Sequence, residues 1–285
     1  MLEHIRVVDL CDGISQFAGH ILAHLGAEVI AVEPTVGVAT RHMGPFVGDE
    51  PDLDASLTHW AYNRGKRSLA LNVESSEDRG EFRTLIASAD IFLEDCRPGY
   101  LSSLGLSYAD LAEINPGLIH ASITPYGSEG PRSRWLGTDL TAVAGSAFMY
   151  ASGDADRAPL RVGLPHSFLH ASADAAAASL IALQERDRSG IGQHIDVSAQ
   201  ESVTIGFPQN VAPMENALAA DRIAGGISLG GMDIPLLFPC RDGYTICVIL
   251  PGVAFAPFSR RLTQWLDEEG VASENLLSID WDNIG

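Results

Sequence analysis

Short apolar runs alternate with amphipathic stretches along the first 205 residues of the chain. The runs are rich in Val, Ile and Leu, which is typical of buried strands. Six of them predict strands: Ile5–Leu10, Glu28–Glu33, Ser68–Val73, Ile91–Glu94, Leu118–Thr124 and Gln193–Val197. The stretches around them predict helices: Gln16–Leu25, Ser75–Ser88 (opening with a capping box), Ser167–Gln184 and Gln200–Ile205. This alternation predicts an α/β fold, with a mostly parallel sheet flanked by helices.

The pattern changes in the last part of the chain. Residues from Pro213 to Pro235 are loop-like and contain two Gly-Gly pairs. Phe238–Leu250 predicts a hairpin that turns at Asp242-Gly243, and Phe255–Glu269 predicts one amphipathic helix. We therefore expect a large domain over residues 1–220, then a linker and an incomplete, smaller α+β domain over residues 221–285.

Composition narrows the possible functions. The chain has 285 residues, 46% of them hydrophobic, and a net charge of -19, with Lys66 as its only lysine. Such an acidic protein has no basic field to attract nucleic acid. No apolar stretch reaches the roughly 18 residues that span a membrane. We expect a soluble, cytoplasmic protein that binds neither nucleic acid nor membrane.

The familiar cofactor motifs are missing from the sequence. The four cysteines are scattered without a C-x-x-C pair, so neither a zinc site nor a disulfide framework is indicated. No G-x-G-x-x-G follows the first predicted strand, which argues against a dinucleotide site. The expected sheet is Rossmann-like in shape only.

Eight short segments together resemble the family III CoA-transferases, the group that includes formyl-CoA transferase and α-methylacyl-CoA racemase. They occur in the family's order: Val7–Leu10, Leu25–Pro34, Asn63–Asn72, Ala89–Gly99, Asn115–Ile123, Arg161–Pro165, Gly190–Ser198 and Phe238–Tyr244. The resemblance implies a Rossmann-like large domain that binds coenzyme A (CoA), a smaller domain, and two interlocked subunits. CoA thioesters would be substrates, with no tightly bound cofactor and no metal.

The resemblance also locates a missing catalytic group. In the family's transferases an aspartate near a helix start attacks the acyl-CoA thioester and forms a mixed anhydride. Phe168 occupies that position here, and Thr138 occupies the position of the racemase histidine, just before Asp139. Because a phenyl ring has no lone pair, no catalytic residue of the known kinds is present.

Some family members are heteromers in which only one type of subunit carries the aspartate. This chain resembles the aspartate-free type, as in benzylsuccinate CoA-transferase, and would pair with an aspartate-bearing homologue. Two alternatives stay open. One is a self-sufficient transferase, isomerase or racemase, acting with copies of itself, that uses His166 or Asp174. The other is a non-enzymatic CoA-binding module.

Four positions match family residues that contact CoA: Arg41, Leu71, Asp95 and Cys96. Two departures weaken the expected phosphate binding. Glu74 stands where formyl-CoA transferase has a lysine, and Ser103 where it has an arginine. Each loses a cation that would face the CoA phosphates.

Three further clusters have two readings each. The basic residues Arg64, Lys66 and Arg67 form either an anion site or a solvated turn. His166, His170 and Asp174 share a helical spacing that suits either a role at a subunit contact or beside the active site, or ordinary packing, and we expect no metal there. The glycines form either a lid over the active site or a flexible linker: Gly225, Gly226, Gly230 and Gly231.

Overall fold

The computed structural model describes most of the chain. The described residues are 1–48, 50–154, 156–206, 225–229, 232–248, 254–281 and 283. They fall into two compact units, each described separately below. Unit 1 comprises Met1–Ser152 and Pro159–Ala220, and unit 2 comprises Gly153–Ala158 and Asp221–Gly285. The predicted domain boundary near residue 220 lies outside the described residues.

Unit 1 is built on a six-stranded parallel sheet with the order β3-β2-β1-β4-β5-β6. The strands are β1 (Arg6–Asp9), β2 (Glu28–Glu33), β3 (Arg67–Ala70), β4 (Ile91–Glu94), β5 (Ile119–Thr124) and β6 (His194–Ser198). The central strand β1 pairs with β2 on one side and with β4 on the other. The strand order therefore reverses between β1 and β4, and the predicted Rossmann-like α/β fold is confirmed.

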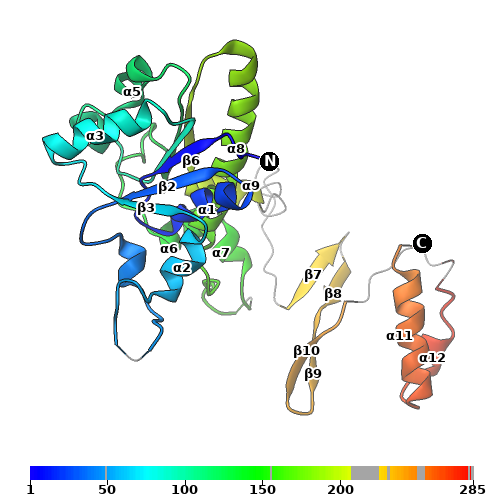
Figure 1. Ribbon diagram of the computed structural model, residues 1–285. Helices are drawn as coiled ribbons and strands as arrows, with labels where there is room; N and C mark the ends of the chain where they lie inside the picture. Colours follow the sequence, from blue (N-terminus) through cyan, green and yellow to red (C-terminus); the bar gives the residue numbers. More distant parts are fainter. Residues whose placement is uncertain are drawn as a thin grey trace. The chain divides into compact units, whose positions relative to one another are not determined.

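Helices cover both faces of this sheet (Figure 1). The helical segments of unit 1 are η1 (Ile14–Gln16), α1 (Phe17–His24), η2 (Ala39–His42), α2 (Leu57–Asn63), α3 (Ser76–Ile86), α4 (Tyr100–Ser103), α5 (Tyr108–Ile114), α6 (Asp139–Gly145), α7 (Phe148–Ala151), α8 (His166–Ser189) and α9 (Ala199–Gly206). Successive strand residues point to opposite faces. Val7 joins a core with α1 and α8, whereas Val8 joins a second core with α3 and α5.

Helix α8 packs closely because its buried face is made of small residues. Ala171, Ala175 and Ala176 are all buried against the core that includes β5 and α1. The helix ends at Gly190, which has φ 75°, a left-handed conformation that favours glycine. Two residues later, a Cβ on Gly192 would lie 1.9 Å from the Leu118 carbonyl oxygen. The Gly-x-Gly pattern thus serves the turn from α8 into β6.

Two local predictions for the first 235 residues were wrong. Ser75 caps α3 by position, but its side chain accepts no hydrogen bond from the helix. Asp78 instead accepts a hydrogen bond from the Asn72 backbone N–H, which draws it away from the predicted capping box. The segment expected to be loop up to Pro235 contains an antiparallel pair, β7 (Gly226–Leu229) and β8 (Met232–Pro235).

Unit 2 also contains the predicted hairpin, formed by β9 (Leu237–Cys240) and β10 (Gly243–Ile246). It turns one residue earlier than expected, at Arg241–Asp242. Two helices follow, α11 (Ala256–Glu268) and α12 (Glu274–Leu277). Buried side chains are few among the described residues of this unit: Ala256, Ser259, Thr263 and Trp281. No helix in the described ranges of either unit is long and apolar enough to cross a bilayer.

Candidate active site

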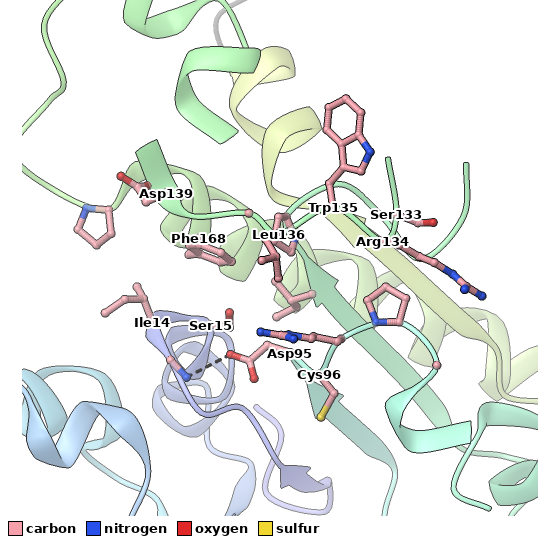
Figure 2. Close-up of a pocket in the computed structure, with 18 of the residues that line it drawn as sticks. Ile14, Ser15, Asp95, Cys96, Ser133, Arg134, Trp135, Leu136, Asp139 and Phe168 are labelled. Atoms are coloured by element: carbon pink, nitrogen blue, oxygen red, sulfur yellow. Dashed lines mark hydrogen bonds between the residues drawn. The ribbon is translucent and has the colours of Figure 1, made fainter. Parts of the chain in front are cut away.

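A pocket of about 730 Å³ opens where the strand order reverses (Figure 2). Its walls come from the loops that follow β1 and β4, from the segment between β5 and α6, and from the start of α8. The lining residues are Gly13, Ile14, Ser15, Met43, Asp95, Cys96, Arg97, Pro98, Gly99, Ile123, Pro125, Ser133, Arg134, Trp135, Leu136, Gly137, Asp139, Pro165 and Phe168. In open α/β sheets, a crevice at the carboxyl ends of the strands and at such a reversal is the usual ligand site.

Asp95 ties the loop after β4 to the loop after β1. Its carboxylate accepts hydrogen bonds from the backbone N–H groups of Asp12, at 2.9 Å, and Gly13, at 3.1 Å. Burial raises the pKa of the Asp95 carboxyl from 3.8 to about 6. Asp95 and its neighbour Cys96 both line the pocket, so these two predicted CoA contacts lie at the site. Burial also raises the pKa of the Cys96 thiol, which makes this cysteine a poor nucleophile.

A buried ion pair between Lys66 and Asp9 also supports the loop after β1. Lys66 Nζ donates to Asp9 Oδ2 at 2.6 Å, to the Gln16 carbonyl at 2.6 Å and to Asn63 Oδ1 at 2.9 Å. The side chains of Lys66 and Asp9 are only 2% and 1% exposed. The other Asp9 oxygen accepts the backbone N–H of Cys11 at 3.1 Å.

This arrangement corrects both readings of the basic cluster. Lys66 is neither part of an anion site nor solvated, because all three of its ammonium protons are used inside the protein. Arg64 and Arg67 are exposed, and Arg67 pairs with Glu28 at 3.0 Å. The three residues are adjacent in sequence but point to different environments.

Phe168 stands in the first turn of α8 and faces the pocket (Figure 2). Its ring also packs against the core cluster that contains Ala171. The hydroxyl of Ser172, one turn later, donates to the Phe168 carbonyl at 2.6 Å and to the Ser15 carbonyl at 3.3 Å. Phe168 is therefore a fixed apolar wall of the site.

Asp139, a second carboxylate in the lining, makes structural contacts with both of its oxygens. Asp139 Oδ1 accepts the Ser167 backbone N–H at 3.0 Å and the Ser167 hydroxyl at 2.8 Å. Its other oxygen pairs with Arg161 at 2.9 Å. Asp139 is the first residue of α6, where the helix dipole stabilises a carboxylate. Because it also binds Ser167, Asp139 joins α6 to the beginning of α8.

His166 and Asp174 are absent from the lining of this pocket. The His166 ring lies 5.7 Å from the Phe148 ring and 6.0 Å from the His170 ring, measured between centroids. Asp174 is exposed on the surface of α8. Among the described residues, no group of three His, Cys, Asp or Glu side chains is placed to hold a metal.

The other two predicted CoA contacts lie away from the pocket lining. Arg41 makes two hydrogen bonds to the Glu33 carboxylate, at 2.6 and 2.8 Å, and pairs with Asp54 at 3.0 Å. The pairing with Glu33 raises the pKa of Arg41, so the guanidinium stays charged. Leu71 is buried in the core that contains Phe82. A CoA contact through Leu71 would have to use its backbone.

The two departures from the family pattern meet around one tyrosine. The Tyr100 hydroxyl donates to Glu74 at 3.0 Å, and the Ser103 hydroxyl donates to the Tyr100 carbonyl at 2.6 Å. Of the glycines, Gly225 has φ 70° and precedes β7, which begins at Gly226. Gly230 and Gly231 lie outside the described residues.

Sequence reasoning missed several lining residues. Arg97 and Arg134 bring positive charge to the pocket, and Trp135 and Leu136 bring exposed apolar surface. Ser15 contributes a buried hydroxyl that has no hydrogen-bond partner among the described residues. The Arg97-Pro-Gly segment directly after β4 was a usable signal, because loops at the carboxyl ends of parallel strands meet at one edge.

Comparison with known proteins agrees with this architecture. The family model described as CoA-transferase family III matches residues 2–277. Succinyl-CoA:(R)-benzylsuccinate CoA-transferase subunit BbsE of Thauera aromatica is 37% identical over 282 residues, which cover 98% of this chain and 67% of that protein. Acetyl-CoA:oxalate CoA-transferase of Acetobacter aceti is 39% identical over 211 residues, 73% of this chain and 53% of that protein.

A solved structure extends the likeness to three dimensions. A CAIB/BAIF family protein from Brucella suis superimposes with a TM-score of 0.80 at 28% identity, covering 98% of this chain and 73% of that one. The chain thus spans between about half and two thirds of the length of the curated relatives named above. With the family model matched over nearly its whole length, the chain belongs to CoA-transferase family III.

Proposed function

We propose that this chain is the non-nucleophilic subunit of a heteromeric CoA-transferase. The complex would move CoA from an acyl-CoA to an organic acid, with the attacking carboxylate supplied by an interlocked, homologous subunit. The observation that carries the proposal is Phe168, an apolar wall in the pocket where the family's aspartate would stand. A relative named as one subunit of a CoA-transferase, at 37% identity, supports the division of labour.

The chemistry needs an oxygen that Phe168 does not have. In the family's reaction, an aspartate attacks the thioester carbonyl, and CoA leaves as the thiolate while a mixed anhydride forms. The thiolate then attacks the aspartyl carbonyl and releases the first acid, after which the second acid collects the CoA. Asp139, a lining carboxylate, is held by Ser167 and Arg161 and does not replace the missing group.

The residues of this chain would then bind and orient rather than react. Asp95 and Cys96, which line the pocket at the end of β4, would contact the nucleotide part of CoA. Arg41 would reach a phosphate only by sharing its guanidinium with Glu33 and Asp54. We expect CoA to bind the free chain weakly and the assembled complex more tightly. We also expect the complex in the cytosol.

Reconstitution with an aspartate-bearing homologue tests this proposal. CoA exchange between an acyl-CoA and free acids is measured for this chain alone, for the homologue alone and for the mixture. Hydroxylamine or borohydride trapping followed by peptide mass analysis locates any acylated residue. We expect exchange in the mixture and a label only on the homologue's aspartate, with a homologue lacking that aspartate as the control.

Other outcomes select the alternatives. Acylation of this chain alone would contradict the proposal and establish a self-sufficient enzyme, and loss of the label in His166→Ala or Asp174→Asn would then identify the residue. CoA binding without exchange in any mixture, and without a stable hetero-oligomer, would leave a CoA-binding module instead.

A further inference from the structure

The pocket beside Phe168 is apolar at one end and cationic at the other. Ile14, Leu136 and Phe168 lie toward one end (Figure 2), and the buried Ile123 also belongs to the lining. Arg97 and Arg134 belong to the lining as well, and Arg134 stands with Ser133 on the side opposite Ile14 (Figure 2). Such a surface suits a ligand with a hydrocarbon part and a separate anionic part.

A buried hydroxyl lies near the apolar end of the pocket. Ser15 is 1% exposed, and its Oγ has no hydrogen-bond partner among the described residues. Figure 2 places it on the pocket floor, near Ile14 and Asp95 and below the Phe168 ring. A buried polar group without a partner is costly, so a ligand atom that accepts its hydrogen bond is favoured there. A thioester carbonyl oxygen is such an acceptor.

We infer that this pocket selects CoA thioesters whose acyl part is a ring or a branched hydrocarbon. This inference rests on the proposed function and adds the class of acyl group. The hydrocarbon packs against Phe168, Ile14 and Leu136, and the carbonyl accepts from Ser15. The anionic part lies toward Arg97 and Arg134. The complex is non-covalent, because Phe168 offers no nucleophile.

The anion at the cationic end has two possible sources, a CoA phosphate or a carboxylate of the acyl group. Both are bound by the same guanidinium chemistry. Acetyl-CoA and succinyl-CoA separate them, because only the acyl part of succinyl-CoA carries a free carboxylate. Phosphate recognition gives similar binding of the two thioesters, whereas carboxylate recognition gives tighter binding of succinyl-CoA.

Calorimetric titration of the full 285-residue chain tests the inference. The probes are free CoA, acetyl-CoA, succinyl-CoA and phenylacetyl-CoA. We expect phenylacetyl-CoA to bind at least about tenfold more tightly than acetyl-CoA, because the ring removes more apolar surface from water.

A matched pair of variants assigns the effect to the pocket. Leu136 is 76% exposed and lines the pocket, whereas Leu160 is 60% exposed and does not. Leu136→Asp should abolish the preference for phenylacetyl-CoA over acetyl-CoA. Leu160→Asp should leave this preference unchanged. Because both side chains are exposed, both variants should fold, as far-ultraviolet circular dichroism will verify.

The failures are distinguishable. Equal affinity for acetyl-CoA and phenylacetyl-CoA, with CoA still bound, would overturn the inference and leave the proposed function standing. A preference that survives Leu136→Asp, or is equally lost in Leu160→Asp, would also overturn it. No binding of CoA or of any thioester, alone or with the homologue, would remove the proposed function itself.

Discussion

Two carboxylates hold the loop between β1 and α1 from opposite sides. Asp95 accepts the backbone N–H groups of Asp12 and Gly13, and Asp9 accepts that of Cys11 while it pairs with Lys66. The same loop supplies Gly13, Ile14 and Ser15 to the pocket. The shape of the pocket floor therefore depends on these two carboxylates, one of which, Asp95, also lines the pocket.

Asp95 gives this loop a pH dependence. Burial raises the pKa of its carboxyl from 3.8 to about 6, so the folded protein holds this proton more tightly than the unfolded chain. The stabilisation is fully present below the unfolded pKa and is lost as the pH rises toward the folded pKa. Relative to Asp95→Asn, the wild-type free energy of unfolding should fall by about 2 kcal/mol between roughly pH 4 and pH 7.

Urea denaturation of both proteins across that pH range measures the difference. A difference that stays constant, or that rises with pH, would show that the two N–H donors outweigh burial at Asp95. Above about pH 7 both proteins should respond to pH alike.

Lys66 should be far more sensitive to mutation than its exposed neighbour. Lys66→Met leaves the buried Asp9 carboxylate without a counter-ion, which should destabilise the protein by about 3–5 kcal/mol. Arg67→Met is the control, since Arg67 is 77% exposed and should lose less than about 1 kcal/mol. Denaturant unfolding measures both. A Lys66→Met protein as stable as Arg67→Met would contradict the structural role of the ion pair.

Gly19 shows how tightly that pair is packed. A Cβ at Gly19 would lie 2.2 Å from Asp9 Oδ2 and 3.1 Å from Lys66 Cε. Helix α1 therefore carries a glycine in its first turn, despite the lower helix propensity of this residue, to let the ion pair lie against its backbone.

At the scale of elements, the position of α8 against the sheet depends on the absence of large side chains from its buried face. Its small buried residues let the helix lie close to the sheet, which brings Phe168 at its start to the pocket. Asp139 and Ser172 then fix that first turn by hydrogen bonds to Ser167 and Ser15. A larger side chain in the buried face of α8 should move the helix away from the sheet and thereby shift Phe168 in the pocket.

Two alanines on α8 test this. Ala175 is buried, whereas Ala177, two residues on, is exposed. Ala175→Leu should lower the free energy of unfolding by about 1–3 kcal/mol because it overpacks the interface. Ala177→Leu should change it by less than about 0.5 kcal/mol, since the helix propensities of Ala and Leu are similar. Equal effects of the two substitutions would mean that α8 packs loosely.

Some elements were predictable from local pattern and others were not. β2 and β4 begin and end at the predicted residues, because continuous apolar runs bounded by polar residues mark buried strands clearly. The pairing of β7 with β8 was missed because its glycines favour a loop reading. Short helices such as α4 and α7 have only four residues each, too few to show a periodic pattern.

At the scale of the whole molecule, the α/β fold followed from element order, but the site required coordinates. Asp95 and Cys96 were predicted from the family resemblance, and both line the pocket, while their contact with CoA stays a prediction. Arg134 and Leu136 were missed because they lie on a connection with no periodic signal. Lys66 was misread because sequence proximity to two arginines says nothing about which side chain runs inward.

The buried Lys66 has a practical consequence for labelling. It is the only lysine in the chain, and its amino group is enclosed by Asp9, Gln16 and Asn63. Succinimidyl dyes and amine cross-linkers need an accessible, neutral amine, so this side chain should stay unmodified while the protein is folded. The fraction of molecules labelled at Lys66 would therefore measure how often the contacts of Lys66 with Asp9, Gln16 and Asn63 open.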